Sequence, residues 1–403
     1  MSETKATVRK RRVFYIPGYD PFPPRRYREL YRKESKAQAA VSGYEIAQKP
    51  RKSDGGPFGW DVTATMGGGD VQARIEVLVW SDIVRSSMRS GVLATYLAMI
   101  RLCWTYLASG AFFRLARLRK GPVIAALYPI VMLIGQLVLA LLIGRLAGAI
   151  LSLTEVPGIG WAGLAVSYYS LWWFRKLDGN LFAYYLTHDY AFSARHNGAN
   201  PPELEARMAE FRTRIAAAMA SDIDEVLVVG HSSGAHLAVS VLADLIRAGE
   251  VPANGPALSF LSLGQVVPMM SFLPKADVLR RDLQFLSVSD RLSWVDVTAP
   301  GDGCAFALCD PVSVSGVATE GKRWPLVLSA AFTQTLAPET WKKLRWRFFR
   351  LHFQYLCAFD RPGDYEYFAI TAGPHTLGER FAGREPSKSR IEAPQSHYTS
   401  TAA

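Results

Sequence analysis

The sequence has few cysteines, and they do not form a motif. Four occur among 403 residues, at Cys103, Cys304, Cys309 and Cys357, with no CxxC pair and no histidine cluster beside them. This spacing argues against a zinc domain and against a disulfide-stapled secreted domain. We therefore expect reduced thiols in a cytosolic compartment and no metal site.

The sequence also lacks an apolar leader, and it has fewer acidic than basic residues. The first stretch, MSETKATVRKRRVF, carries charges with no apolar run behind them, so we expect no cleavable signal peptide. Basic residues number 46 against 35 acidic ones, a net charge of +11. They lie in separate clusters, and the cluster Arg114–Lys120 borders the most apolar part of the chain. This placement favours a lipid membrane as the partner and disfavours nucleic acid.

Charge is absent from two long stretches, Gly121–Gly144 and Val156–Phe174. At about 1.5 Å per helical residue, each can cross a hydrocarbon core about 30 Å thick. Basic residues precede the first stretch and follow the second, so a hairpin of two spans would have both outer ends in the cytoplasm. The alternative is a pair of helices buried in a large core. The apolar segment 92–115 is interrupted by Arg101 and is typical of an interfacial or lid-like helix.

Outside this apolar region, short apolar runs alternate with segments of helical periodicity. We expect strands over 13–16, 73–80 and 226–229, and further strands near 261–267, 294–298 and 365–371. This alternation predicts an α/β fold with a mostly parallel sheet and helices on both faces. The expected organisation is an N-terminal part of the α/β domain (1–91), a membrane-associated helical insertion (92–176), a C-terminal part of the same domain (177–383) and a disordered tail (384–403).

The stretch VLVVGHSSGAHLAVSVLADLI, residues 226–246, places a G-x-S-x-G pentapeptide between a β-branched run and a helical pattern. In that context it is typical of a nucleophile elbow, a tight turn that lifts a serine to the end of a sheet. Gly230 and Gly234 would provide the space that the turn around Ser232 needs. The alternative is a glycine-rich connection without chemistry.

On these residues the chain resembles the α/β-hydrolase superfamily and, more loosely, its serine lipases and esterases. The resemblance covers the elbow, the N-terminal strand and loop, and the order of elements in the C-terminal half. It implies one oxyanion N–H from Ser233 and a second from the loop VFYIPGYDP, at Gly18 or Tyr19. That loop lacks the His-Gly pair common in the family, so the second donor is open between these two residues.

The family order of nucleophile, acid and histidine leaves two bases and two acids to consider. His352 lies 50 residues after the best acid and is followed by a tyrosine three residues later, whereas the alternative base His375 follows an expected strand directly. Asp302 follows the expected strand 294–298 in a PGDG loop, where an acid can orient a histidine. Asp310 is the alternative acid. We favour His352 with Asp302.

Together these features predict a membrane-anchored serine hydrolase that cleaves carboxylic esters or acyl thioesters through an acyl-enzyme, without a metal or other cofactor. We expect an integral protein of the inner or cytoplasmic membrane, with the catalytic domain in the cytoplasm and a lipid or other ester as substrate. The sequence does not indicate the oligomeric state. The alternative function is a membrane scaffold or binding protein whose hydrolase-like fold has lost its chemistry.

Overall fold

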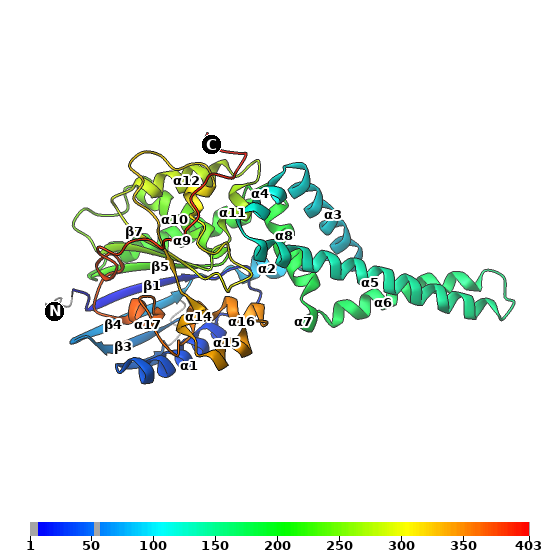
Figure 1. Ribbon diagram of the computed structural model, residues 1–403, viewed down its shortest axis with the longest axis horizontal. Helices are drawn as coiled ribbons and strands as arrows, with labels where there is room; N and C mark the ends of the chain where they lie inside the picture. Colours follow the sequence, from blue (N-terminus) through cyan, green and yellow to red (C-terminus); the bar gives the residue numbers. More distant parts are fainter. Residues whose placement is uncertain (1–6, 52–56, 403) are drawn as a thin grey trace.

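The computed structural model describes residues 7–51 and 57–402, so part of the N-terminal stretch on which the signal-peptide expectation rests lies outside the described residues. Its centre is an eight-stranded sheet in the order β2-β3-β4-β1-β5-β6-β7-β8 (Figure 1). The strands from β4 to β8 pair in parallel, and β2 and β3 add an antiparallel edge. The strands are β1 (Lys10–Ile16), β2 (Glu45–Pro50), β3 (Gly59–Met66), β4 (Gly69–Val77), β5 (Glu225–His231), β6 (Ala257–Leu263), β7 (Ser293–Thr298) and β8 (Leu326–Ser329).

Helices connect most of these strands. Before β5 they are α1 (Arg25–Ser42), α2 (Ser81–Ser87), α3 (Val92–Ala108), α4 (Ala111–Leu118), α5 (Lys120–Ser152), the 3₁₀ turn η1 (Ile159–Trp161), α6 (Ala162–Lys176), α7 (Asp178–Leu181), α8 (Ala183–Ala194) and α9 (Pro202–Met219). After β5 they are α10 (Gly234–Arg247), α11 (Val267–Ser271), α12 (Asp277–Val288), α13 (Pro311–Val314), α14 (Phe332–Thr335), α15 (Pro338–Leu344), α16 (Phe348–His352), the 3₁₀ turn η2 (Gln354–Leu356), α17 (Tyr367–Ala372) and α18 (Leu377–Arg380).

Both faces of the sheet are covered, as the alternation of strands and helices predicts. Successive side chains of a strand point to opposite faces. Val226 and Val228 of β5 therefore pack in one core with α9, α10 and α12, and Leu227 and Val229 pack in a second core with α1 and α17. Strands buried on both faces explain why the β5 sequence is continuously apolar.

Helices α3 to α8, which lie between β4 and β5 in the chain, form an insertion that extends away from the sheet (Figure 1). Within the described residues, α5 is the single helix long and apolar enough to cross a membrane, and only 22% of its most apolar window is buried; α2 and α3 pass the same test only as a pair bent by 102°. Helix α6 runs along α5, and their glycines meet so closely that a Cβ on Gly163 would lie 2.2 Å from the Gly144 carbonyl oxygen.

The second apolar stretch gives a shorter helix than expected. Gly158 has a left-handed φ of 75°, and a 3₁₀ turn follows it, so the regular helix α6 begins only at Ala162 and has 15 residues. The helix formed by the first stretch is longer than expected: α5 continues eight residues past Gly144, through Arg145, and ends at Ser152.

The strand expected near 365–371 is wrong, because this segment forms helix α17. The Glu366 side chain accepts hydrogen bonds from the backbone N–H groups of Phe368 and Ala369, and this N-cap starts a helix in a sequence rich in aromatic residues. The expected strand near 261–267 ends four residues early, at Leu263, because Gly264 takes a left-handed φ of 54°. Strands β2, β3 and β8 were not anticipated.

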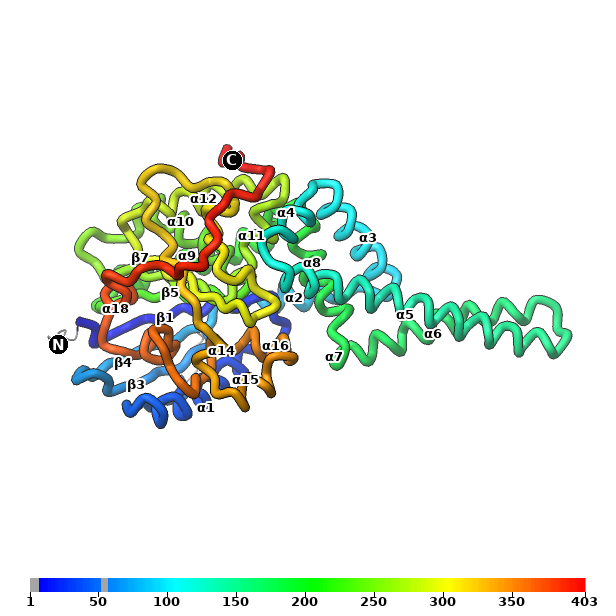
Figure 2. The backbone as a smooth tube through the Cα atoms, viewed as in Figure 1, coloured from blue at the N-terminus to red at the C-terminus, as the bar shows by residue number. Residues whose placement is uncertain are grey.

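The C-terminal tail, expected to be disordered, lies along the surface of the α/β domain (Figure 2). Its backbone joins the domain at several points: the Ile391 N–H donates to Leu308, and the Gln395 N–H donates to Val314. Further on, the Arg280 side chain of α12 donates to the Ser400 carbonyl at 2.8 Å. The tail has few apolar side chains, so these hydrogen bonds to its backbone attach it to the domain.

Candidate active site

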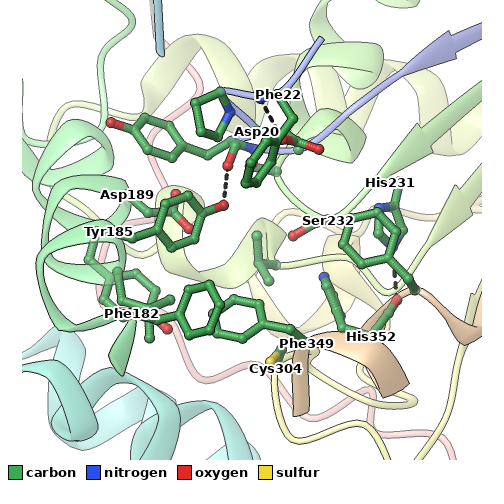
Figure 3. A pocket seen from close by; sticks show the side chains of 18 of the residues that line it. Asp20, Phe22, Phe182, Tyr185, Asp189, His231, Ser232, Cys304, Phe349 and His352 are labelled. Carbon is green, nitrogen blue, oxygen red and sulfur yellow. Dashed lines mark hydrogen bonds between the residues drawn. The ribbon is translucent and has the colours of Figure 1, made fainter. Parts of the chain in front are cut away.

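The candidate site lies where the parallel strands end. Loops after β1, β5 and β7 supply Tyr19, Ser232 and Asp302, and His352 closes helix α16. Ser232 and His352 line a cavity of about 770 Å³, within the size range of small-molecule sites. Figure 3 shows the Ser232 hydroxyl and the His352 ring facing this cavity, with Asp189 on its other side. Ligands of open α/β sheets bind at this edge.

Ser232 stands on a strained turn between β5 and α10. Its φ is 58°, a left-handed conformation that is uncommon for residues other than glycine and is found at functional sites. The Ser232 N–H donates to the Leu263 carbonyl of the neighbouring strand β6 at 2.9 Å, which holds the turn in place. Ser232 is partly exposed, whereas His231 and Ser233 on either side of it are buried. The turn therefore presents one hydroxyl to the cavity.

Glycines surround the turn where other chain segments approach it. A Cβ on Gly234 would lie 2.2 Å from the Ile16 carbonyl oxygen, and one on Gly230 would lie 2.7 Å from the Ala235 Cα. A Cβ on Gly18 would lie 2.9 Å from the Ser232 Cβ. Each contact is with a backbone or β-carbon atom that cannot move without shifting the turn. The glycines of the pentapeptide and of the β1 loop are thus required by the same close packing.

The structure brings His352 and Asp302 together. The His352 Nδ1 and the Asp302 Oδ2 are 2.7 Å apart, and both side chains are buried. Asp302 also accepts hydrogen bonds from the Cys304 N–H at 2.9 Å and from the Tyr355 hydroxyl at 3.0 Å. Burial alone would raise the pKa of the Asp302 carboxyl, but the neighbouring His352 and these donors lower it below its ordinary value. The carboxylate is therefore ionised and can hold an imidazolium.

Two further residues, neither assigned a role from the sequence, support this pair. The His231 Nε2 lies 3.0 Å from the backbone carbonyl of His352, and burial lowers the pKa of His231 to about 3, so a neutral ring donates this bond. The Tyr355 hydroxyl accepts from the Ala299 N–H at 3.0 Å while it donates to Asp302. His231 thus fixes the backbone of His352, and Tyr355 fixes the Asp302 carboxylate. The signal for Tyr355 was its position three residues after His352.

The expected oxyanion donors lie beside Ser232 but are not equivalent. Among the described residues, no hydrogen bond engages the backbone N–H of Ser233, which precedes the first turn of α10. The Tyr19 N–H instead donates to the Ser233 hydroxyl at 2.8 Å. Gly18 packs directly against Ser232. The backbone N–H of Ser233 is therefore free to donate to a ligand. The Tyr19 N–H becomes available as a second donor when the Ser233 hydroxyl moves away from it.

The alternative base and acid lie elsewhere. The backbone carbonyl of His375 accepts a hydrogen bond from Arg11, whose side chain pairs with Glu225 at the starts of β1 and β5. His375 therefore lies near the start of β5, at the opposite end of this strand from Ser232. Asp310 caps α13 by accepting from the Val312 and Ser313 N–H groups at 2.9 and 3.0 Å, and it forms an ion pair with Lys322. Both residues therefore lie among contacts that hold the fold together.

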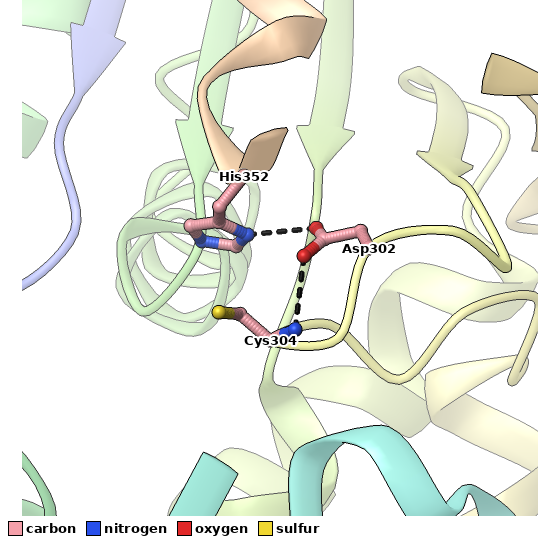
Figure 4. Close-up of side chains that lie close together, drawn as sticks. All are labelled: Asp302, Cys304 and His352. Atoms are coloured by element: carbon pink, nitrogen blue, oxygen red, sulfur yellow. Dashed lines mark hydrogen bonds and ion pairs between the residues drawn. The ribbon is translucent and has the colours of Figure 1, made fainter. Parts of the chain in front are cut away.

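Cys304 lies beside the histidine and acid pair (Figure 4). The ligand atoms of Asp302, Cys304 and His352 all lie within 4.8 Å of one another, close enough to hold a metal ion. However, the nitrogen of His352 that faces Asp302 forms a hydrogen bond at 2.7 Å, and burial raises the pKa of the Cys304 thiol well above its ordinary value. A metal ion here would have to displace the proton of that hydrogen bond, so the contacts of this trio suit a hydrogen-bonded histidine and carboxylate.

A further carboxyl group, unnoticed in the sequence, faces the cavity from helix α8. Asp189 lines the same cavity as Ser232 and His352, and among the described residues its side chain has no hydrogen-bond partner. Burial raises its pKa to about 7. Near neutral pH, Asp189 is therefore a carboxyl group on the cavity that can carry a proton.

The arrangement comprises a serine on a left-handed turn, a histidine bonded to a buried carboxylate, and backbone N–H groups beside the serine. Such groups can activate a hydroxyl and stabilise an oxyanion. Comparisons with models of known protein families, with curated proteins and with solved structures find no match for this chain.

Proposed function

We propose that this protein is a membrane-anchored serine hydrolase of the α/β-hydrolase type that cleaves carboxylic esters or acyl thioesters. The observation that carries the proposal is the meeting of three features: the left-handed Ser232 turn, the His352 ring on the same cavity, and the 2.7 Å bond from His352 to Asp302. A strained serine between a strand and a helix is the geometry of a nucleophile elbow, and the histidine and acid pair supplies the base that it needs.

In the proposed reaction, the Ser232 oxygen attacks the carbonyl carbon while its proton passes to the Nε2 of His352. The C=O electron pair moves to the oxygen, and the N–H of Ser233, with that of Gly18 or Tyr19, stabilises the oxyanion. Collapse expels the alcohol or thiol, which takes the proton from His352, and leaves an acyl-serine. Water then attacks the acyl-serine with His352 again as base, releasing the carboxylic acid and restoring Ser232. Asp302 stabilises the imidazolium at each stage.

We further propose that α5 and α6 enter the inner or cytoplasmic membrane as a hairpin with the catalytic domain in the cytoplasm. The support is the apolar surface that α5 exposes, including Ile124 at 65% and Val131 at 66%, and the charges at the end nearest the sheet. Lys120 begins α5 and Lys176 ends α6, so both basic borders lie at that end. Basic residues at this level suit the cytoplasmic face of a membrane.

A fluorophosphonate probe tests the chemistry, because only an activated serine reacts with it at a useful rate. We expect labelling of the full chain, and loss of labelling in Ser232→Ala and His352→Ala but not in the matched control His375→Ala. Hydrolysis of p-nitrophenyl butyrate should fall by about a thousandfold or more in Ser232→Ala. A folded Ser232→Ala protein with most of its activity would refute the assignment.

The same assay separates the alternatives. A membrane scaffold with a hydrolase-like fold would bind no probe at Ser232 at all. If Asp302, Cys304 and His352 instead held a catalytic metal ion, EDTA would abolish ester hydrolysis and Cys304→Ser would be inactive. We expect activity to survive EDTA, because the proposed steps use only side chains and backbone N–H groups.

A further inference from the structure

A second cavity of about 350 Å³ adjoins the catalytic cavity at the base of the helical insertion. Its walls come from α3, α4 and α5 on one side and from α8, α11 and Phe306 on the other. Pro122, Tyr190 and Met269 line both cavities, so the two are separated by no more than shared side chains. A ligand chain that extends from Ser232 into the second cavity therefore has to pass only these three side chains.

The walls of this second cavity are suited to hydrocarbon. Among the described residues, no charged side chain lines it, and the lining is otherwise aliphatic and aromatic apart from one cysteine and two tyrosines. The Tyr106 hydroxyl is already committed, since it donates to the Met269 carbonyl at 3.0 Å. A polar ligand would find almost no partners here, whereas an aliphatic chain would remove apolar surface from water.

The cavity also lies next to the apolar outer surface of the insertion. Helix α3, which forms one wall, exposes Leu93, Leu97, Ile100 and Trp104 along one face, with exposures of 71, 58, 60 and 73%. Helix α5, which forms another wall, is the helix with the length and composition of a membrane span. The second cavity thus stands between the Ser232 cavity and the surface through which the chain would contact lipid.

We infer that this cavity holds one long aliphatic chain of the substrate, drawn from the lipid bilayer, with the ester carbonyl placed at Ser232. The inference rests on the proposed function and names its substrate class: long-chain acyl esters or thioesters. The polar part of the substrate would remain in the larger cavity, where Asp20, Arg26 and Lys33 of the β1 loop and α1 contribute to the lining.

Filling the second cavity tests this inference. Ala126 lines it, while Ala125, the preceding residue of α5, does not, so Ala126→Trp and Ala125→Trp form a matched pair. In Ala126→Trp we expect kcat/KM for p-nitrophenyl palmitate to fall by at least about tenfold and that for p-nitrophenyl butyrate to stay within about twofold. Ala125→Trp should leave both substrates unchanged. Val123→Phe, a smaller filling of the same cavity, serves if Ala126→Trp does not fold.

A second readout does not depend on catalysis. The full-length Ser232→Ala protein in liposomes is irradiated with a palmitic acid analogue that carries a diazirine in mid-chain. We expect label on the peptides containing Met269 or Phe306, which belong to the α/β domain and not to the proposed spans, and loss of that label when Ala126→Trp is added. Retention of the label in Ala126→Trp, or equal losses of palmitate and butyrate hydrolysis, would overturn the inference. If the label is lost in Ala126→Trp but the wild-type protein hydrolyses no ester, the aliphatic-chain site is kept and the proposed hydrolase activity is rejected.

Discussion

Removal of the Tyr355 hydroxyl tests whether Asp302 acts through its hydrogen bonds. Tyr355 is fully buried and lies against Phe332 with ring centroids 5.0 Å apart, so Tyr355→Phe keeps the packing and removes one oxygen. That oxygen donates to Asp302 and accepts from the Ala299 N–H, both at 3.0 Å. The substitution therefore deprives a buried carboxylate of a donor and leaves a buried N–H without an acceptor.

The expected size of the effect follows from these two bonds. A hydrogen bond to a charged group contributes about 1.5–3 kcal/mol, and each factor of ten in rate corresponds to about 1.4 kcal/mol. If the loss is expressed in the transition state, kcat/KM for p-nitrophenyl butyrate falls about tenfold to a hundredfold. Because the negative charge of the His352–Asp302 pair is then less stabilised, the pair binds a proton more tightly and the acid limb of the pH profile moves to higher pH.

Tyr365→Phe is the control, because it also removes a buried tyrosine hydroxyl but one that donates to the Tyr355 carbonyl at 2.7 Å rather than to Asp302. It should lower stability without moving the acid limb. An acid limb unchanged in Tyr355→Phe, with kcat/KM within about twofold of the wild type, would show that Asp302 does not act as the acid of this site.

Two further predictions concern the cavity carboxyl and the membrane. Burial raises the pKa of Asp189 from 3.8 to about 7, so the folded protein holds a proton that the unfolded chain releases, and stability falls as pH rises through this window. Asp189→Asn should therefore unfold at a higher temperature than the wild type at pH 8 and at a similar temperature near pH 4; an equal difference at both pH values would exclude this cause. For the insertion, reporter fusions after Lys120 and Lys176 should both give cytoplasmic signals, and alkaline carbonate should leave the protein in the membrane; release of the whole chain into the soluble fraction would rule out the hairpin.

The parts of the fold and site that sequence reasoning anticipated are those with local causes. The apolar β5 run, the Gly-x-Ser-x-Gly turn and the following helix are neighbours in the chain, so their local pattern is enough to predict a turn at Ser232. The choice of His352 with Asp302 depended on the order of elements, and the structure places these two in contact. Their catalytic roles stay predictions.

The parts that were missed depend on contacts between distant segments. His231 contacts a residue 121 positions away, and Asp189 of α8 lines the same cavity as Ser232, which lies 43 positions later in the chain. The tail forms backbone bonds to residues 308–314, which its composition does not reveal. The segment of α17 is rich in residues that favour strands, but the Glu366 carboxylate caps its N-terminus and it forms a helix.

The position of the insertion within the sheet has a consequence for the order of synthesis. Strand β1 pairs with β4 on one edge and with β5 on the other, yet all of α3 to α8 is translated between β4 and β5. A ribosome therefore releases the apolar helices while β1 still lacks one neighbour and before Ser232 exists. Under the proposed function, the nascent chain meets the membrane first and completes its sheet afterwards. If both proposals hold, the Ser232 site is completed only after the apolar helices have reached the bilayer.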